Sequence, residues 1–133
     1  RFYQLFLSIM PSKEHFQFFT CSYLKVEIQR HRNKLLKITK LTEEQLSELE
    51  ELVTQHITFI DERLIPQDLL IRTEVQLKSI DTDDTVFVAL TKHLEGKLWT
   101  GDMQLYNGLK AKRFRDIILT SELSLLLDDL ERD

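Results

Sequence analysis

The sequence is poor in residues that build tight turns and cross-links. It has only 3 Gly and 2 Pro in 133 residues, too few for the hairpins of a β-sandwich or small barrel, so an all-β fold is nearly excluded. The single cysteine, Cys21, cannot form an intrachain disulfide, which indicates a reducing, cytoplasmic compartment. No apolar run approaches the roughly 20 residues that span a bilayer, so we expect no membrane segment.

The sequence also lacks an excess of positive charge. It has 18 Lys and Arg and 22 Asp and Glu, which gives a formal net charge of -4. This excludes a protein that holds nucleic acid by its overall charge, and any phosphate contact must come from local patches. The sequence does contain 42% hydrophobic and 30% charged residues, as folded globular proteins do. At this length we expect a single domain over residues 1–133.

Apolar segments alternate with amphipathic ones along the whole chain. Helical spacing of apolar residues predicts a first helix over residues 2–10, which Pro11 stops. Strands are predicted over residues 16–20, 56–60, 97–100 and 116–119, and further helices over residues 22–36, 42–55, 66–80, from 83 onward, 102–109 and 120–129. This alternation without hairpin turns predicts an α/β fold with a central parallel sheet flanked by helices.

Two of the predicted helices have informative sequences. Thr42 and Gln45 form a capping box, in which each side chain accepts a hydrogen bond from the backbone N–H of the other residue. Residues 86–90 are apolar on every side, which predicts a helix in the interior of the domain. Trp99 lies in a short strand, where we expect it to pack in the core rather than to stack on a nucleic-acid base.

Acidic residues recur where strands give way to helices. In an open parallel sheet the binding crevice lies at these junctions, and Glu27, the segment Asp81–Asp84 and Asp102 all fall there. Helix capping is the simpler explanation of each acid taken singly. However, Glu27 is too far into its helix to cap it, and Asp84 directly precedes the apolar helix. Converging carboxylates repel one another unless a cation lies between them, which favours magnesium or manganese.

Other chemistries have weaker support. The histidines, His15, His31, His56 and His93, lack zinc-ligand spacing, and there is neither a glycine-rich phosphate loop nor a nucleophile elbow. The pair Asp81 and Asp83 could be the paired aspartates of a phosphotransferase. The residues before the pair are predicted to be helical rather than an apolar strand, which argues against that interpretation.

Three segments together resemble the PIN-domain family. Residues 80–90 (IDTDDTVFVAL) and 98–102 (LWTGD) are similar to the third and fourth acidic motifs of that family. Residues 20–31 (TCSYLKVEIQRH) resemble the helix that bears its second acid. The family's first acid ends an N-terminal central strand that would precede Arg1, so we expect this strand and acid upstream of the present sequence.

The resemblance implies a three-layer α/β/α nuclease that cuts single-stranded RNA, often as the toxin of a toxin–antitoxin pair. It implies that Glu27, Asp84 and Asp102 are catalytic and bind Mg²⁺ or Mn²⁺, with Asp81 as an additional ligand and Thr100 as a supporting hydroxyl. It also suggests homodimers and an antitoxin partner. The alternative function is a PIN-like module that has lost catalysis and binds RNA or protein.

Two basic clusters are candidates for RNA contact. They contain Arg30 and Lys34, and Lys110 and Arg113. Salt bridges to the acidic helix at residues 42–55 are the simpler explanation of the first cluster. The functional explanation of both is that they attract phosphate groups to the crevice.

Overall fold

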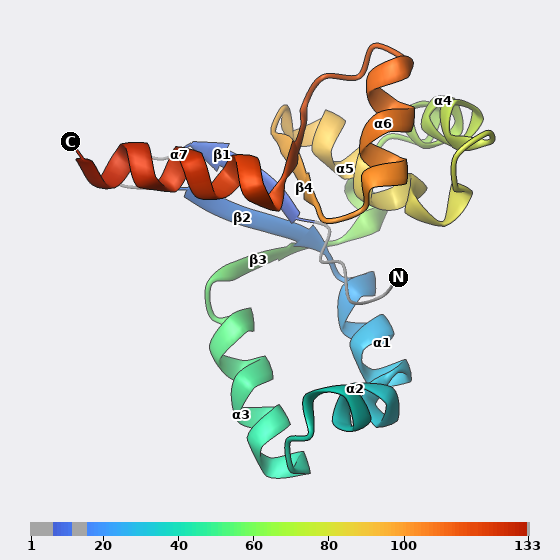
Figure 1. Ribbon diagram of the computed structural model, residues 1–133. Helices are drawn as coiled ribbons and strands as arrows, with labels where there is room; N and C mark the ends of the chain where they lie inside the picture. Colours follow the sequence, from blue (N-terminus) through green and yellow to red (C-terminus); the bar gives the residue numbers. More distant parts are fainter. Residues whose placement is uncertain (1–6, 12–15, 133) are drawn as a thin grey trace.

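The computed structural model of the protein describes residues 7–11 and 16–132. Figure 1 shows the elements in order. They are β1 (Leu7–Pro11), β2 (Phe16–Cys21), α1 (Tyr23–Arg30), α2 (Arg32–Thr39), α3 (Glu43–Thr54), β3 (Ile57–Ile60), the 3-10 turn η1 (Glu62–Leu64), α4 (Gln67–Leu77), the 3-10 turn η2 (Thr82–Asp84), α5 (Thr85–Leu94), β4 (Lys97–Thr100), α6 (Met103–Ala111), β5 (Ile117–Leu119) and α7 (Thr120–Arg132). The α/β fold is therefore confirmed.

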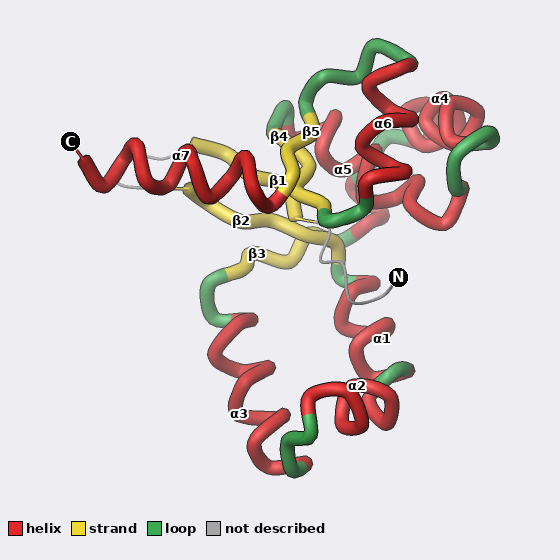
Figure 2. The backbone as a smooth tube through the Cα atoms, in the orientation of Figure 1, coloured by secondary structure: helices red, strands yellow, loops and turns green. Residues whose placement is uncertain are grey.

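The strands form one sheet in the order β3-β2-β1-β4-β5 (Figure 2). Strands β2 and β3 are parallel, as are β4 and β5, whereas β1 is antiparallel to both β2 and β4. Since β2 and β4 both run opposite to β1, the four outer strands run in one direction. Their carboxyl ends therefore lie along a single edge of the sheet.

Strand β1 corrects two predictions. The helix predicted over residues 2–10 is wrong from Leu7 to Met10, which are β-strand, and residues 2–6 lie outside the described residues. The sheet is also not parallel at its centre. Backbone pairing with β2 and β4 on both sides outweighs the local helical pattern, and Pro11 pairs only with Phe16, beyond the end of the β4 ladder. The central position, where the family resemblance places a parallel strand, is occupied by β1.

Apolar side chains from alternate strand positions point to opposite faces of the sheet. On one face Leu98 and Ile117 pack with α5, in which Val88 and Ala89 are fully buried. On the other face Ile118 packs with Leu123 of α7. Helices thus cover both faces, and the predicted interior helix is confirmed. Each fully buried aliphatic side chain of this core contributes about 1.5–3 kcal/mol relative to exposure.

Trp99 lies on the α7 face of the sheet, as part of its packing. The ring is half-buried with its centroid 5.9 Å from that of Phe18, and its Nε1–H donates a hydrogen bond to Thr120 Oγ1 at 3.0 Å. This agrees with the predicted core role.

Helices α1, α2 and α3 form a group that extends away from the sheet (Figure 1). The capping box of α3 is confirmed: Gln45 N–H donates to Thr42 Oγ1 at 3.1 Å and Thr42 N–H donates to Gln45 Oε1 at 3.0 Å. The single helix predicted over residues 22–36 is instead two helices, α1 and α2, that meet at His31. The bend allows Arg32 to bind Glu50 of α3 at 2.9 Å.

No helix in the described part of the chain has both the length and the apolar character that a membrane crossing requires.

Candidate functional site

The candidate site lies at the edge of the sheet where the parallel strands end. Strands β2 and β4 flank β1, and Ser8 of β1 pairs with both Phe19 and Leu98. Phe19 and Leu98 therefore lie at the same position along the strand direction. Each is two residues before the end of its strand, because β2 ends at Cys21 and β4 ends at Thr100. With about 4.8 Å between neighbouring strands, the ends of β2 and β4 are roughly 10 Å apart. Acidic side chains that follow these two ends can therefore face the same space.

Glu27 follows β2 on helix α1. The start of this helix is fixed because Ser22 N–H donates to Ile60 O at 3.0 Å and the Leu24 side chain is buried in the main core. Glu27 is half-buried in the second turn, too far from the helix start to cap it. Capping therefore does not explain this carboxylate.

Asp84 enters the site from helix α5. This helix contacts β1, β2 and β4 and leads into the start of β4, so its own start lies toward the carboxyl edge. Asp84 occupies the N-cap position of α5 but makes no capping hydrogen bond with its side chain. Its exposed fraction is 0%, which is costly for a carboxylate and rare for a merely structural one. Asp84 is the most buried acid at the candidate site.

Asp81 and Asp102 both cap helical segments. Asp81 Oδ1 accepts a hydrogen bond from Asp83 N–H at 3.0 Å at the start of η2. Asp102 Oδ1 accepts from Gln104 N–H at 2.9 Å and Leu105 N–H at 3.2 Å at the start of α6. Helix capping, the simpler explanation of these acids, is thus confirmed for Asp81 and Asp102. The two capping bonds of Asp102 meet on one carboxylate oxygen.

Thr100 is the fully buried last residue of β4. Its Oγ1 accepts a hydrogen bond from Asp102 N–H at 3.0 Å. The hydroxyl thus holds the backbone of the turn between β4 and α6. The supporting role that the resemblance implies for Thr100 stays a prediction.

The predicted acids share an edge but do not form a compact cluster. Within residues 7–11 and 16–132, no three His, Cys, Asp or Glu side chains are grouped so that they could hold a metal ion. Strand β1 runs the opposite way, so its carboxyl end at Pro11 lies at the other edge and does not supply the family's first acid. Among the described residues, the structure brings the candidate ligands only to the same edge of the sheet.

The four candidate RNA contacts are all exposed but lie in two separate places. Arg30 and Lys34 are on α1 and α2, whereas Lys110 is in the last turn of α6 and Arg113 follows that helix, which lies apart from α1 and α2 (Figure 1). Lys110 Nζ lies 4.6 Å from the centre of the Tyr106 ring. The structure therefore does not join the two clusters into one basic surface.

Cys21 lies near the candidate acids but differs from them in chemistry. Its side chain is fully buried, and burial, assisted by the negative charge of Glu62, raises the pKa of the thiol to about 12. The thiol is therefore neutral near pH 7, and a neutral thiol is a poor metal ligand and nucleophile.

Comparison with known proteins identifies one family. A family model described as PIN domain matches residues 6–122, a range that includes Glu27, Asp81, Asp84 and Asp102. No curated protein and no solved structure matches the chain.

Proposed function

The chain belongs to the PIN-domain family, whose members are generally nucleases, and on that premise we propose that it is a metal-dependent endoribonuclease acting on single-stranded RNA. The observation that supports this most strongly is the fully buried carboxylate of Asp84, at the edge of the sheet that Glu27 and Asp102 also occupy. A buried acid is costly, so its presence at a binding edge favours a functional role.

The donor set suits a hard divalent cation. Glu27, Asp84 and Asp102 offer only carboxylate oxygens, the ligands that Mg²⁺ and Mn²⁺ prefer, with Asp81 as an additional candidate ligand. Capping uses Oδ1 of Asp102, so we assign its Oδ2 to the cation. When bound, such a cation supplies an activated water and stabilises negative charge on the leaving oxygen.

The protein's own residues position these donors. Burial of Asp84 keeps its carboxylate away from bulk water, and the Thr100 hydroxyl holds the backbone of Asp102. The Asp81 cap orders η2, directly before the helix that Asp84 begins. These contacts hold three candidate ligands on rigid elements, as a preorganised site requires.

We assign substrate and partner contacts to different surfaces. The exposed side chains of Arg30, Lys34, Lys110 and Arg113 are the proposed phosphate contacts. Exposed apolar residues on the α1–α3 group, namely Val26, Ile38, Leu49 and Leu52, are the surface that we propose for an antitoxin protein. The buried free thiol of Cys21 suits a reducing compartment, and we place the reaction in the cytoplasm.

The test is cleavage of a labelled single-stranded RNA by the full-length protein with Mn²⁺, with a chelator, and with the Asp102→Asn variant. Asparagine caps helices about as well as aspartate, so this substitution removes the charge and keeps the cap. We expect cleavage that requires the metal and falls by at least about 100-fold in the variant.

A different result would favour the binding-module alternative. If the folded full-length protein leaves RNA intact in Mn²⁺ but binds it with strong salt dependence, the nuclease proposal is wrong and the chain is an RNA-binding PIN module.

A further inference from the structure

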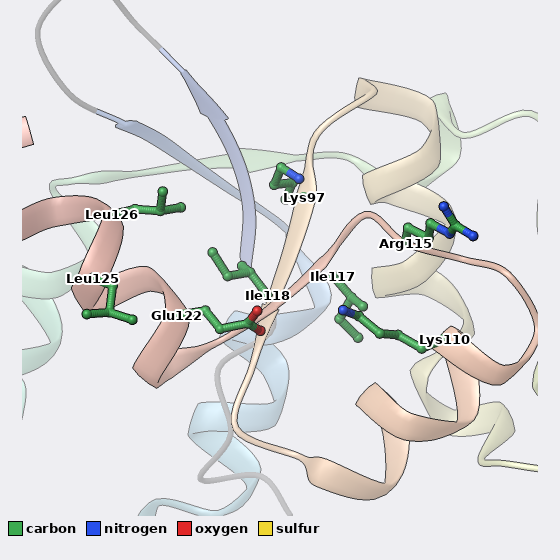
Figure 3. Close-up of a pocket in the computed structure, with 8 residues that line it drawn as sticks. All are labelled: Lys97, Lys110, Arg115, Ile117, Ile118, Glu122, Leu125 and Leu126. Atoms are coloured by element: carbon green, nitrogen blue, oxygen red, sulfur yellow. The ribbon is translucent and has the colours of Figure 1, made fainter. Parts of the chain in front are cut away.

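A pocket lies beside the edge strand β5, between helices α6 and α7 (Figure 3). Its volume is about 400 Å³, within the range of pockets that hold a small organic molecule. None of the four candidate metal ligands is among its lining residues. The proposed metal site therefore does not explain this pocket, and its own side chains must indicate what it can bind.

The lining of the pocket has an excess of positive charge. Exposed Lys110 and Arg115 lie toward one end, and exposed Lys97 of β4 lies nearby (Figure 3). These three cations share the pocket with one carboxylate, that of Glu122, so two positive charges have no acid among the lining residues. A phosphomonoester carries a charge of about -1.5 to -2 near pH 7 and would balance them, whereas a carboxylate ligand would leave one unbalanced.

Glu122 adds a hydrogen-bond acceptor near the middle of the pocket (Figure 3). Its Oε1 accepts a hydrogen bond from Leu119 N–H at 3.0 Å, and this bond is the main cause that lowers the pKa of Glu122. Tyr106 and the charge of Lys110 lower this pKa further. An ionised carboxylate only accepts hydrogen bonds, so Glu122 favours a ligand with a hydroxyl group next to its phosphate.

The other end of the pocket is apolar. Leu125 is 66% exposed and Leu126 is 41% exposed, and both lie on the side of Glu122 away from Arg115 (Figure 3). Buried Ile118 of β5 also contributes to the lining. Exposed apolar side chains beside a charged end suit a ligand whose body is apolar or aromatic. The pocket thus presents cations, a hydrogen-bond acceptor and an apolar wall in that order.

We propose that this pocket binds a nucleoside monophosphate, which has a phosphomonoester, hydroxyl groups and an aromatic base in the same order. The three cationic side chains hold the phosphate by charge-assisted hydrogen bonds, Glu122 accepts from a ribose hydroxyl, and Leu125 and Leu126 contact the base. The site does not depend on the proposed nuclease activity, because it contains none of the candidate metal ligands. It does include Lys110, a proposed RNA contact, so the experiments separate a terminal phosphate from the RNA backbone.

The first test is calorimetric titration of the full chain with adenosine monophosphate, adenosine and inorganic phosphate, each in the presence of a chelator. We expect adenosine monophosphate to bind with a dissociation constant of about 10–100 μM, at least about tenfold tighter than either of the other probes. The reason is that only this probe reaches both the cationic end and the apolar end. No binding up to about 1 mM, or equal binding of adenosine or inorganic phosphate, would overturn the proposal.

The second test uses matched pairs of variants. Lys97→Gln should weaken binding of adenosine monophosphate by about tenfold, whereas Lys37→Gln, at an exposed lysine on α2, should leave it unchanged. Leu125→Ser should weaken it by at least about threefold, whereas Leu64→Ser should not, because Leu64 is also 66% exposed but lies in η1. Equal affinities within both pairs would contradict a ligand in this pocket.

The third test identifies the source of the nucleotide. Bound adenosine monophosphate is challenged with a short RNA that has either a phosphate or a hydroxyl group at its 5′ end, again with a chelator so that the RNA stays intact. Displacement only by the phosphorylated RNA would assign the pocket to the end of an RNA chain, and displacement by neither would assign it to a free nucleotide. Equal displacement by both would show that the pocket contacts internal phosphodiesters, and the proposal would be wrong.

Discussion

At the scale of single residues, helix capping explains why position 102 is an aspartate but does not explain the aspartate at position 84. Asp102 caps α6 through Oδ1, so a structural role accounts for its identity, whereas Asp84 is fully buried and its side chain caps nothing at the start of α5. The sequence pattern sets Asp84 apart as the acid that directly precedes the apolar helix, but it does not give the depth of either side chain. Their depth depends on how α5 packs across the sheet, which is a property of the whole fold.

Cys21 gives a prediction at the same scale. At pH 8, alkylation of native protein by iodoacetamide should be far slower than alkylation in urea. The thiol is fully buried, and a pKa of about 12 instead of 9.0 reduces the reactive thiolate by about 1000-fold. Mass spectrometry after timed quenching measures both rates. Equal rates in the two conditions would show that the Cys21 environment described here is incorrect.

At the scale of elements, local sequence determined some segments and tertiary pairing determined others. The capping box at Thr42 needs only residues within one turn, and it was predictable from the sequence. Strand β1 depends on its partners β2 and β4, and its residues, read alone, indicate a helix. The same limit explains the bend at His31, where Arg32 reaches α3. Local patterns therefore predict caps and amphipathic faces better than they predict strand pairing.

Helix α6 gives a prediction at this scale. A Cβ atom added to Gly108 would lie 2.8 Å from two atoms of Ile80, directly before Asp81, so Gly108 allows α6 to approach the acidic segment closely. We expect Gly108→Ala to lower the free energy of unfolding by about 1–3 kcal/mol despite the better helix propensity of alanine. Thermal or urea denaturation measures this change.

The matched control for Gly108→Ala is Asn107→Ala, at the neighbouring, exposed position of the same helix. This control should be neutral or slightly stabilising, because alanine favours a helix and position 107 is exposed. A Gly108→Ala variant as stable as this control would contradict the close packing of α6 on Ile80.

At the scale of the whole molecule, the sequence predicted the class of fold better than the geometry of the site. Alternating segments indicated α/β architecture, and the acidic motifs indicated the PIN-domain family, which the family match over residues 6–122 bears out. The prediction of a parallel sheet was wrong, because β1, predicted as a helix, is a strand antiparallel to both neighbours, and such pairing depends on distant residues. Whether Glu27, Asp84 and Asp102 act together stays a prediction, since the described residues share an edge without forming a metal cluster.

The measurement that tests the central claim most directly compares two adjacent aspartates. Full-length Asp84→Asn and Asp83→Asn variants, each verified as folded by circular dichroism, would be assayed for Mn²⁺-dependent cleavage of single-stranded RNA. Asp83 is exposed and Asp84 is fully buried at the candidate site. Comparing the two variants therefore separates the loss of a proposed metal ligand from the loss of a nearby negative charge. We predict a loss of at least about 100-fold for Asp84→Asn and near wild-type cleavage for Asp83→Asn. Wild-type cleavage by a folded Asp84→Asn variant would contradict the account.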